Sequence, residues 1–431
     1  MRLSQCISVR CLRKALLRLI LVNKKPSLLI QLVVKISLMS ASTPRRHSGA
    51  SSPLQCMSLW SRPGFVSRRG WLWLFLALLM GATVAGSWWW TQQRPITVAV
   101  GVDLPLVPSA AIDPSDRNSA DLVLEQRPGS RIRLVNHYNA PDPATAAASI
   151  AALKRQGVRF FVTTQASSHA VPSLPQFAGA DALAINVSAV SDQLSGKDDG
   201  FFRIVPDVTQ EQRALARALH RLPGRRLLVL QDTGNRAWTD PAFALFEAEL
   251  NRLGGWTIIR RQLRVTDFDP QLHRPMLEED VDALYLLAGA FLPIIGNISQ
   301  LFSQLHPSAP ILLTPWARSP AIVENAGHAS ARFLVISPYP ARREDPVVDR
   351  YFERFEQRYG YTPYAMTIGT SQAIELLDQA FRSGATTPAQ VKRFLLAQPV
   401  HQTRFGSVRF DTNGDVRADF HAFPALADRA P

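Results

Sequence analysis

The 431-residue sequence contains no cysteine after Cys56 and no acidic residue before Asp103. The first absence excludes disulfides, a thiolate nucleophile and cysteine-bound metal from most of the chain. The second leaves residues 1–70 with thirteen Lys and Arg and no opposite charge. Arg94 adds one more, so 34 basic residues remain to balance all 34 acidic ones. The net charge of +14 therefore belongs to the N-terminal part. The neutral remainder lacks the charge pattern of a nucleic-acid binder, and we predict no nucleic-acid partner.

Motifs of common catalytic and nucleotide-binding sites are also missing. The nine histidines show no HExxH or HxH spacing, and no G-x-S-x-G, P-loop or GxGxxG is present. His169 lies beside Ser167 and Ser168, but neighbours on one loop rarely meet as base and nucleophile. We therefore expect no enzyme, no cofactor and no metal. The aspartates that we assign to turns rather than to calcium are Asp267, Asp269, Asp411 and Asp415.

Trp71–Trp90 is an apolar run of twenty uncharged residues that ends in three tryptophans. Twenty residues in a helix rise about 30 Å, which is the thickness of the hydrocarbon core of a bilayer. Arg68 and Arg69 lie just before the run, so the positive-inside rule keeps the N-terminus in the cytoplasm and exports the rest. We expect a retained single-pass anchor. Cleavage after Ala85 is the alternative, and it would release the exported domain.

The basic segment before this run, residues 1–70, is predicted to be cytoplasmic and without a fold of its own. Its stretch Ser40–Gln55 has the Ser-, Pro- and Arg-rich composition of disordered chains. Met39 and Met57 are alternative start positions to Met1, because a compact anchor would also begin at either of them.

Beyond Pro95, short β-rich runs alternate with amphipathic helical stretches. The predicted strands are Ile96–Val102, Arg131–His137, Arg159–Thr164, Ala182–Val187, Leu227–Asp232, Trp256–Leu263, Asp282–Gly289, Ile311–Thr314, Arg332–Ser337 and Ser407–Phe410. The predicted helices are Pro143–Arg155, Thr209–Arg221 with Thr209 as N-cap, Pro241–Leu253, Pro346–Tyr359, Thr367–Arg382 and Thr387–Ala397. Apolar strands separated by long helices indicate parallel sheets covered on both faces. Two such series indicate two α/β lobes, with a ligand site beyond the carboxyl ends of the strands.

Four blocks of this region resemble the branched-chain amino-acid (Leu/Ile/Val) branch of the type I periplasmic solute-binding proteins. The first is the strand Ile96–Val102 with the later segment Asn139–Ser168, which is similar to a strand end, an Asp-Pro helix, a third strand and a serine-bearing loop. The others are Gly200–Leu219, similar to a crossover between lobes, Tyr351–Phe381, similar to a late helix pair, and Phe405–Val416, similar to a closing hairpin.

The resemblance implies an α/β fold of two doubly wound parallel-sheet lobes joined by crossover strands and preceded by the transmembrane helix 71–90. Lobe 1 would comprise residues 95–205 and 338–404, and lobe 2 residues 206–337 and 405–431. Such proteins capture a small molecule, here an amino acid or related compound, for an ABC permease of the bacterial inner membrane. The expected location is therefore that membrane, with the C-terminal domain in the periplasm. The alternative is a sensor or envelope scaffold that regulates another inner-membrane protein, and the anchor favours it.

In this family, two loops of lobe 1 hold the carboxylate of the ligand. They match Thr163–Ser168 and Asn186–Leu194 here, and the threonine usual in the second loop is replaced by Val190. Valine cannot donate a hydrogen bond, so a nearby serine would have to do so. The lobe-1 candidates are Ser167, Ser168, Ser188 and Ser191. Turn formation is the alternative role for each of them.

The candidates in lobe 2 are Trp238, Trp316 and Arg318. The family often has an acidic residue after the strand that matches Ile311–Thr314, where it pairs with the ammonium of the ligand, but Pro315 stands there. An unpaired buried ammonium costs several kcal/mol, so we expect a ligand that lacks a free α-ammonium group. The tryptophans would stack on this ligand and Arg318 would pair with an anion. Core packing for Trp316 and a solvated surface charge for Arg318 are the alternatives.

Overall fold

The computed structural model describes residues 75–84, 86, 94–103, 113–139, 142–289 and 292–428. The chain divides into two compact units, Met1–Arg94 and Pro95–Pro431. In the first unit, residues 75–84 are helical. Within the described ranges, no helix has both the length and the apolar character needed to cross a membrane. The predicted cytoplasmic segment 1–70 and both ends of the predicted anchor lie outside these ranges.

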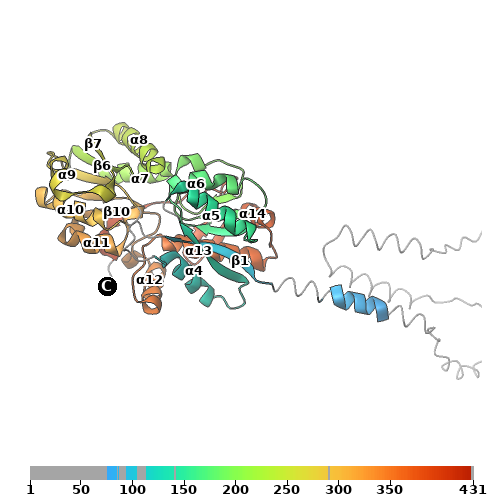
Figure 1. Ribbon diagram of the computed structural model, residues 1–431. Helices are drawn as coiled ribbons and strands as arrows, with labels where there is room; N and C mark the ends of the chain where they lie inside the picture. The colour runs from blue at the N-terminus through green and yellow to red at the C-terminus, as the bar shows by residue number, and fades with distance from the viewer. Residues whose placement is uncertain are drawn as a thin grey trace, which may run out of the picture. The chain divides into compact units, whose positions relative to one another are not determined.

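The sheet of lobe 1 has the strand order β2-β1-β3-β4-β5, and all its pairs are parallel. Its strands are β1 Ile96–Asp103, β2 Ile132–Asn139, β3 Phe160–Thr163, β4 Leu183–Asn186 and β5 Phe201–Arg203. The helices that follow these strands are α4 Ser115–Glu125, α5 Pro143–Arg155 and α6 Ser167–Ser173. Val98 packs with α4 on one face of the sheet, and its neighbour Ala99 packs with α5 on the other. Helices therefore cover both faces (Figure 1).

The sheet of lobe 2 has the order β13-β10-β9-β8-β6-β7. Its strands are β6 Arg226–Asp232, β7 Thr257–Leu263, β8 Ala283–Leu287, β9 Ile311–Leu313, β10 Phe333–Ser337 and β13 His421–Pro424. Its helices are α7 Val208–His220, α8 Arg236–Leu253, α9 Pro270–Leu277, α10 Ile294–Leu305 and α11 Pro320–Ala326. Leu227 packs with α7 and α8, whereas Leu228 packs with α10 and α11. The edge strand β13 is antiparallel, with Phe423 opposite Val335, and the sequence analysis did not predict it.

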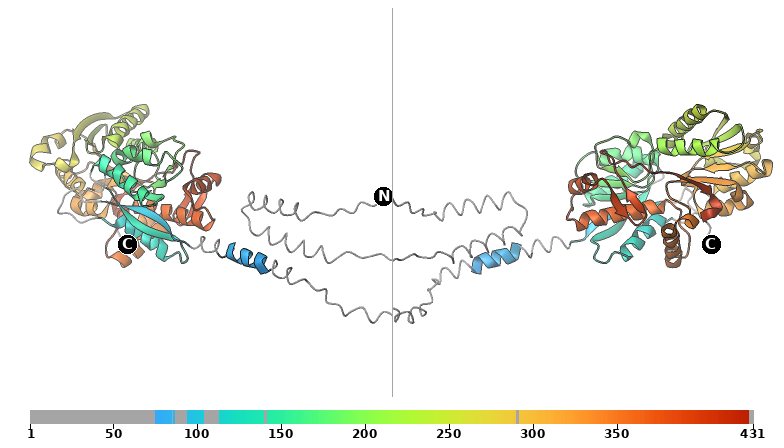
Figure 2. Two further views of the ribbon diagram at one scale, coloured as in Figure 1. Left: turned by 45° about the vertical axis from the view of Figure 1, so that its right-hand side comes forward. Right: turned by 180° about the vertical axis from the view of Figure 1, so that it is seen from behind.

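The remaining elements pack mainly on lobe 1 or connect the lobes (Figure 2). They are α12 Pro346–Tyr359, α13 Thr367–Arg382, α14 Pro388–Ala397, and the hairpin of β11 His401–Thr403 with β12 Gly406–Val408. Short 3-10 turns are 174–176, 192–194, 265–267, 315–317, 327–332, 342–344 and 425–428. The chain passes between the two sheets after β5, after β10 and after β12. The first and third of these crossovers pair through a parallel bridge between Pro206 and Val416.

Two predicted helix starts are wrong. Helix α7 begins at Val208, because Asp207 rather than Thr209 is the N-cap and accepts a 2.9 Å hydrogen bond from Gln210 N. Helix α8 begins at Arg236, so that Pro241 lies inside it. Its first turn buries Trp238 and Thr239, and the hydroxyl group of Thr239 donates a hydrogen bond to Asp232 O. This tertiary packing outweighs the one backbone hydrogen bond that a proline removes.

Candidate functional site

The carboxyl ends of the two sheets meet where α6 of lobe 1 contacts α8 of lobe 2. The backbone N–H of Ser168, at the start of α6, donates to Asn235 Oδ1 at 3.2 Å. Asn235 is the N-cap residue of α8. This hydrogen bond joins loops that follow β3 and β6, which belong to different sheets. The edge at which parallel α/β sheets usually bind ligands is therefore also the place where these lobes touch.

The two predicted loops of lobe 1 lie together. Ser167 is buried, and its Oγ accepts hydrogen bonds from the N–H groups of Val190 and Ser191, each at 3.2 Å. Ser191 is also buried, and its Oγ caps the following 3-10 turn by accepting from Gln193 N. Ser188 donates its N–H to Asn186 Oδ1 in a tight turn. These three residues therefore make the loop contacts that were weighed as the alternative to ligand binding.

Ser168 differs from the other serines. Its Oγ lies 3.0 Å from Nδ1 of His169, so the expectation that these adjacent side chains do not meet is wrong. Both residues lie in the first turn of α6. The backbone of Ser168 reaches lobe 2 at the same time, which makes Ser168 the predicted serine with a direct contact across the lobes.

Gln165 was missed by the sequence analysis. It is the second residue after β3 and is only 1% exposed, yet neither Nε2 nor Oε1 has a hydrogen-bond partner among the described residues. Leaving a buried amide unpaired costs about 1–3 kcal/mol. A polar residue just beyond the carboxyl end of a fully buried strand was the signal available in the sequence. The position of Gln165 beside Ser167 and Ser168 makes its amide a ligand-contact candidate.

Trp238 and Trp316 are both buried, and both side chains lie against Gly289, two residues beyond the end of β8. A Cβ atom at Gly289 would lie 2.6 Å from Trp316 Cβ and 3.2 Å from the ring of Trp238. Glycine at this position therefore allows the two side chains to approach the strand end. Trp316 Nε1 donates to Glu211 Oε2 at 3.1 Å. Trp316 thus occupies the packed position that was considered as the alternative to ligand stacking.

Glu211, on the first turn of α7, is a second residue that the sequence analysis missed. It is 1% exposed, and burial raises its pKa to about 8, although hydrogen bonds from Trp316 and Gln212 act in the opposite direction. The indole N–H of Trp238 also faces this carboxyl, but it lies outside hydrogen-bonding geometry. An acidic side chain therefore does lie beside the 315–317 turn, supplied by α7. It is protonated at neutral pH and covered by Trp316.

Arg318 is placed differently from both sequence interpretations. It is 4% exposed, so it is not a solvated surface charge. Its guanidinium is paired with Asp428 and donates to Ser337 Oγ and to the carbonyl groups of Tyr339 and Pro340, at 2.5 to 2.9 Å. These contacts leave it little capacity for the anion of a ligand. Arg318 instead holds the second crossover against lobe 2.

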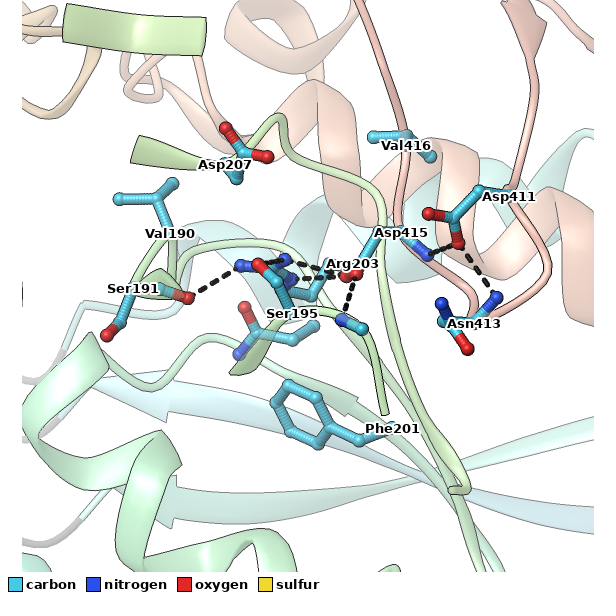
Figure 3. Close-up of polar contacts among 12 residues, drawn as sticks. Val190, Ser191, Ser195, Phe201, Arg203, Asp207, Asp411, Asn413, Asp415 and Val416 are labelled. Atoms are coloured by element: carbon cyan, nitrogen blue, oxygen red, sulfur yellow. Dashed lines mark hydrogen bonds and ion pairs between the residues drawn. The ribbon is translucent and has the colours of Figure 1, made fainter. Parts of the chain in front are cut away.

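A second buried arginine joins the other crossovers (Figure 3). Arg203 at the end of β5 is 1% exposed and donates through Nε and Nη2 to Asp415 Oδ1, at 2.8 and 2.6 Å. It also donates to Ser191 O at 2.9 Å and to Ser195 Oγ at 2.6 Å. Asp411 forms the turn predicted for it, because its Oδ1 accepts from the N–H groups of Asn413 and Asp415. Arg203 therefore connects a predicted ligand loop, which contains Ser191, to the crossover that follows β12.

Comparison with known proteins supports the architecture. The model of the periplasmic binding protein family matches residues 95–424. Similar solved structures include a leucine-binding protein from Thermotoga maritima, with 21% identity, a TM-score of 0.65, and coverage of 76% of this chain and 94% of that one. A branched-chain amino-acid substrate-binding protein from Streptococcus pneumoniae, solved with isoleucine, has 16% identity, a TM-score of 0.65 and coverage of 76% and 95%.

A solute-binding protein of an ABC transporter from Rhodopseudomonas palustris, solved with 3,4-dihydroxybenzoic acid, has 14% identity, a TM-score of 0.66 and coverage of 76% and 92%. At these identities the solved structures establish a shared fold. A search of curated proteins finds no significant match. The family model, by contrast, covers most of the chain and agrees with the resemblance predicted from the sequence. The chain belongs to the periplasmic binding protein family, with the α/β fold of its type I members.

Proposed function

We propose that this chain is an exported solute-binding protein, and not an enzyme, that closes its two lobes on a small molecule for an ABC importer. The observation that carries the proposal is the buried amide of Gln165, which has no hydrogen-bond partner among the described residues. It lies at the sheet edge where Ser168 of lobe 1 contacts Asn235 of lobe 2. A solute bound there would satisfy the amide and contact both lobes, which favours the closed state.

The chemistry of the residues near this site limits the chemical class of the solute. A glutamine amide offers both a donor and an acceptor, and a hydroxyl or amide group of a ligand satisfies both. Pro315 stands where an ammonium partner was expected, and the nearby Glu211 is protonated and covered. We therefore propose a solute without a free α-ammonium group. Among the similar solved structures, one is a leucine-binding protein and two are complexes with isoleucine and with 3,4-dihydroxybenzoic acid. The last of these ligands has no ammonium group.

Replacing Gln165 with leucine tests the site. We expect the Gln165→Leu variant to bind the solute at least about fivefold more weakly, since the solute group that paired with the amide would be left buried without a partner, which costs about 1–3 kcal/mol. The unliganded variant should be more stable than wild type by a similar amount, because no unpaired amide remains buried. Native mass spectrometry of residues 95–431 purified from the source cells identifies the solute. Calorimetric titration and urea unfolding then give the two free energies.

Gln372→Leu is the matched control. Gln372 is also buried, but its Nε2 donates to Thr403 Oγ1 and its Oε1 accepts from Tyr339 Oη, each at 3.0 Å. Its replacement should lower stability and leave solute affinity unchanged. Wild-type affinity in the Gln165→Leu variant would show that the solute binds elsewhere.

The membrane anchor is proposed on the sequence pattern alone. Thirteen basic residues precede the uncharged run Trp71–Trp90 and no acidic residue does, so we expect the N-terminus inside the cell and the C-terminus outside. A C-terminal alkaline phosphatase fusion should be active, and a C-terminal green fluorescent protein fusion should be dark. A fluorescent fusion together with inactive phosphatase would contradict both the orientation and the periplasmic location.

The alternative function keeps the solute site but makes the protein a sensor or envelope scaffold. The predicted anchor is the feature that favours it, because a carrier that shuttles solutes benefits from free diffusion. Neighbouring genes for a permease and an ATPase would support transport. A neighbouring gene for a histidine kinase or a cell-wall synthase would support the alternative.

A further inference from the structure

A cavity of about 510 Å³ lies in lobe 1, between the end of α4, one face of α12, α13 and the β11–β12 hairpin. Gln126 and Arg127 of its wall connect α4 to β2, so this wall lies at the amino edge of the sheet. The loops of the solute site follow the carboxyl ends of the strands, at the opposite edge. The cavity is therefore separate from the site between the lobes, and its volume is within the range of small-molecule sites.

Positive charge dominates the wall of this cavity. Its charged lining residues are Arg127, Arg350, Arg354, Arg404 and Glu375. The excess is local, because the acidic and basic residues beyond Arg94 are equal in number. Arg350 and Arg354 lie one turn apart on α12, on the same side as Tyr351. Like charges placed this close repel each other, and a bound anion would remove the repulsion.

The two buried carboxylates nearby already pair with arginines, although Oδ1 of Asp378 has no hydrogen-bond partner among the described residues. Glu375 accepts from the side chain of Arg404 and, at 3.0 Å, from its backbone N–H, and it pairs with Arg127 at 3.3 Å. Asp378, behind the wall, pairs with Arg127 at 3.1 Å and with Arg382 at 2.7 Å. These pairs fix two of the guanidinium groups from behind. Arg350 and Arg354 form no ion pair with Glu375, Asp378 or any other carboxylate in the part of the chain that the structure describes.

Hydrogen-bond donors exceed acceptors in the cavity. Arg350 forms no hydrogen bond or ion pair within the described ranges. The buried Nε of Arg127 also has no partner there. The Nη1 atoms of Arg354 and Arg404 donate to the same acceptor, Gln126 Oε1. Each guanidinium carries five N–H donors arranged to bind carboxylate or phosphate oxygens in pairs. This excess of donors suits a ligand that carries several anionic oxygens.

We propose that this cavity is a second binding site, for a small multivalent oxyanion such as a phosphate ester or a polycarboxylate. Arg350 and Arg354 bind the exposed side of the anion, and Arg127 and Arg404 bind it from the wall. This site does not depend on the solute proposed for the cleft between the lobes. Its test therefore leaves that proposal untouched.

Calorimetric titration of the purified full-length protein with inorganic pyrophosphate, citrate and acetate tests the site. We expect saturable one-to-one binding of pyrophosphate or citrate that weakens as salt is raised, and no saturation by acetate. Preference for pyrophosphate would identify a phosphate-type ligand, and preference for citrate a polycarboxylate. Arg350→Gln and Arg354→Gln should each weaken binding at least tenfold. Both side chains are exposed, so neither change should alter the unfolding midpoint.

Arg358→Gln is the control on the same helix, because Arg358 pairs with Glu125 at 3.0 Å and does not line the cavity. It should bind the anion as wild type does. The proposal is overturned if neither pyrophosphate nor citrate saturates, or if the Arg350→Gln and Arg354→Gln variants bind the anion as tightly as Arg358→Gln.

Discussion

Replacement of Arg203 by alanine should lower the free energy of unfolding of residues 95–431 by about 3–5 kcal/mol, the usual cost of removing one partner of a buried ion pair. Arg203 is 1% exposed, and its partner Asp415 retains only 14% side-chain exposure. The variant also leaves Ser191 O and Ser195 Oγ without their donor. Urea unfolding followed by circular dichroism measures the change. Solute affinity should fall as well, because Ser191 lies in a loop of the proposed site.

Arg226→Ala is the control for this experiment. Arg226 pairs with Asp280 at 2.6 Å, the same length as the shorter Arg203 contact, but the two side chains are 45% and 92% exposed. An exposed pair is worth up to about 1 kcal/mol. Equal losses of unfolding free energy in the Arg203→Ala and Arg226→Ala variants would show that burial beside the crossovers does not determine the energetic contribution of Arg203.

Replacement of Glu211 by glutamine should stabilise the protein above neutral pH. Burial raises the pKa of Glu211 from 4.5 to about 8 in the folded state. Between these pH values the unfolded chain loses a proton that the folded chain keeps. The free energy of unfolding therefore falls as pH rises from about 4.5. The contribution of the protonated Glu211 is fully lost only above about pH 8. Glutamine resembles the protonated carboxyl and cannot ionise, so the variant avoids this loss, which is on the order of 5 kcal/mol when complete.

Urea unfolding at pH 4, 6 and 8.5 measures this effect. The advantage of the Glu211→Gln variant should grow with pH, and it should vanish at pH 4, where the carboxyl is protonated in both states. Parallel curves for the two proteins over this range would mean that Glu211 titrates in the folded protein as it does in the unfolded chain. That result would remove the basis for treating the group as neutral beside Trp316.

Local signals were sufficient for several helices. Helices α5, α12 and α13 have the predicted bounds. Asp142 before Pro143 caps α5 by accepting from Thr145 N, and Asp345 before Pro346 does the same for α12. Gly360, with φ of +79°, ends α12. A side-chain cap, a proline in the first turn and a terminal glycine all act within a few residues. They can therefore be predicted without knowing the tertiary structure.

The candidate site could be predicted only in part. The loops that carry Ser167, Ser168 and Ser191 follow strands whose positions along the chain were predicted from apolar runs, and the structure brings these loops together. What each side chain does there depends on partners that arrive from elsewhere. Ser167 accepts hydrogen bonds from the backbone of another loop, whereas the side-chain amide of Gln165 has no partner among the residues that the structure describes.

By itself, the sequence determined the neutral two-lobed α/β domain, the basic N-terminal segment and the family, because composition and strand–helix alternation are properties of consecutive residues. Only the tertiary structure decided the roles of the buried polar groups. Arg203 and Asp415 are 212 residues apart, and Trp316 lies 105 residues from Glu211. Arg318 likewise pairs with a distant residue, Asp428, which lies 110 residues later in the chain. Desolvation makes such groups costly unless a partner is present, and folding alone determines which partner that is.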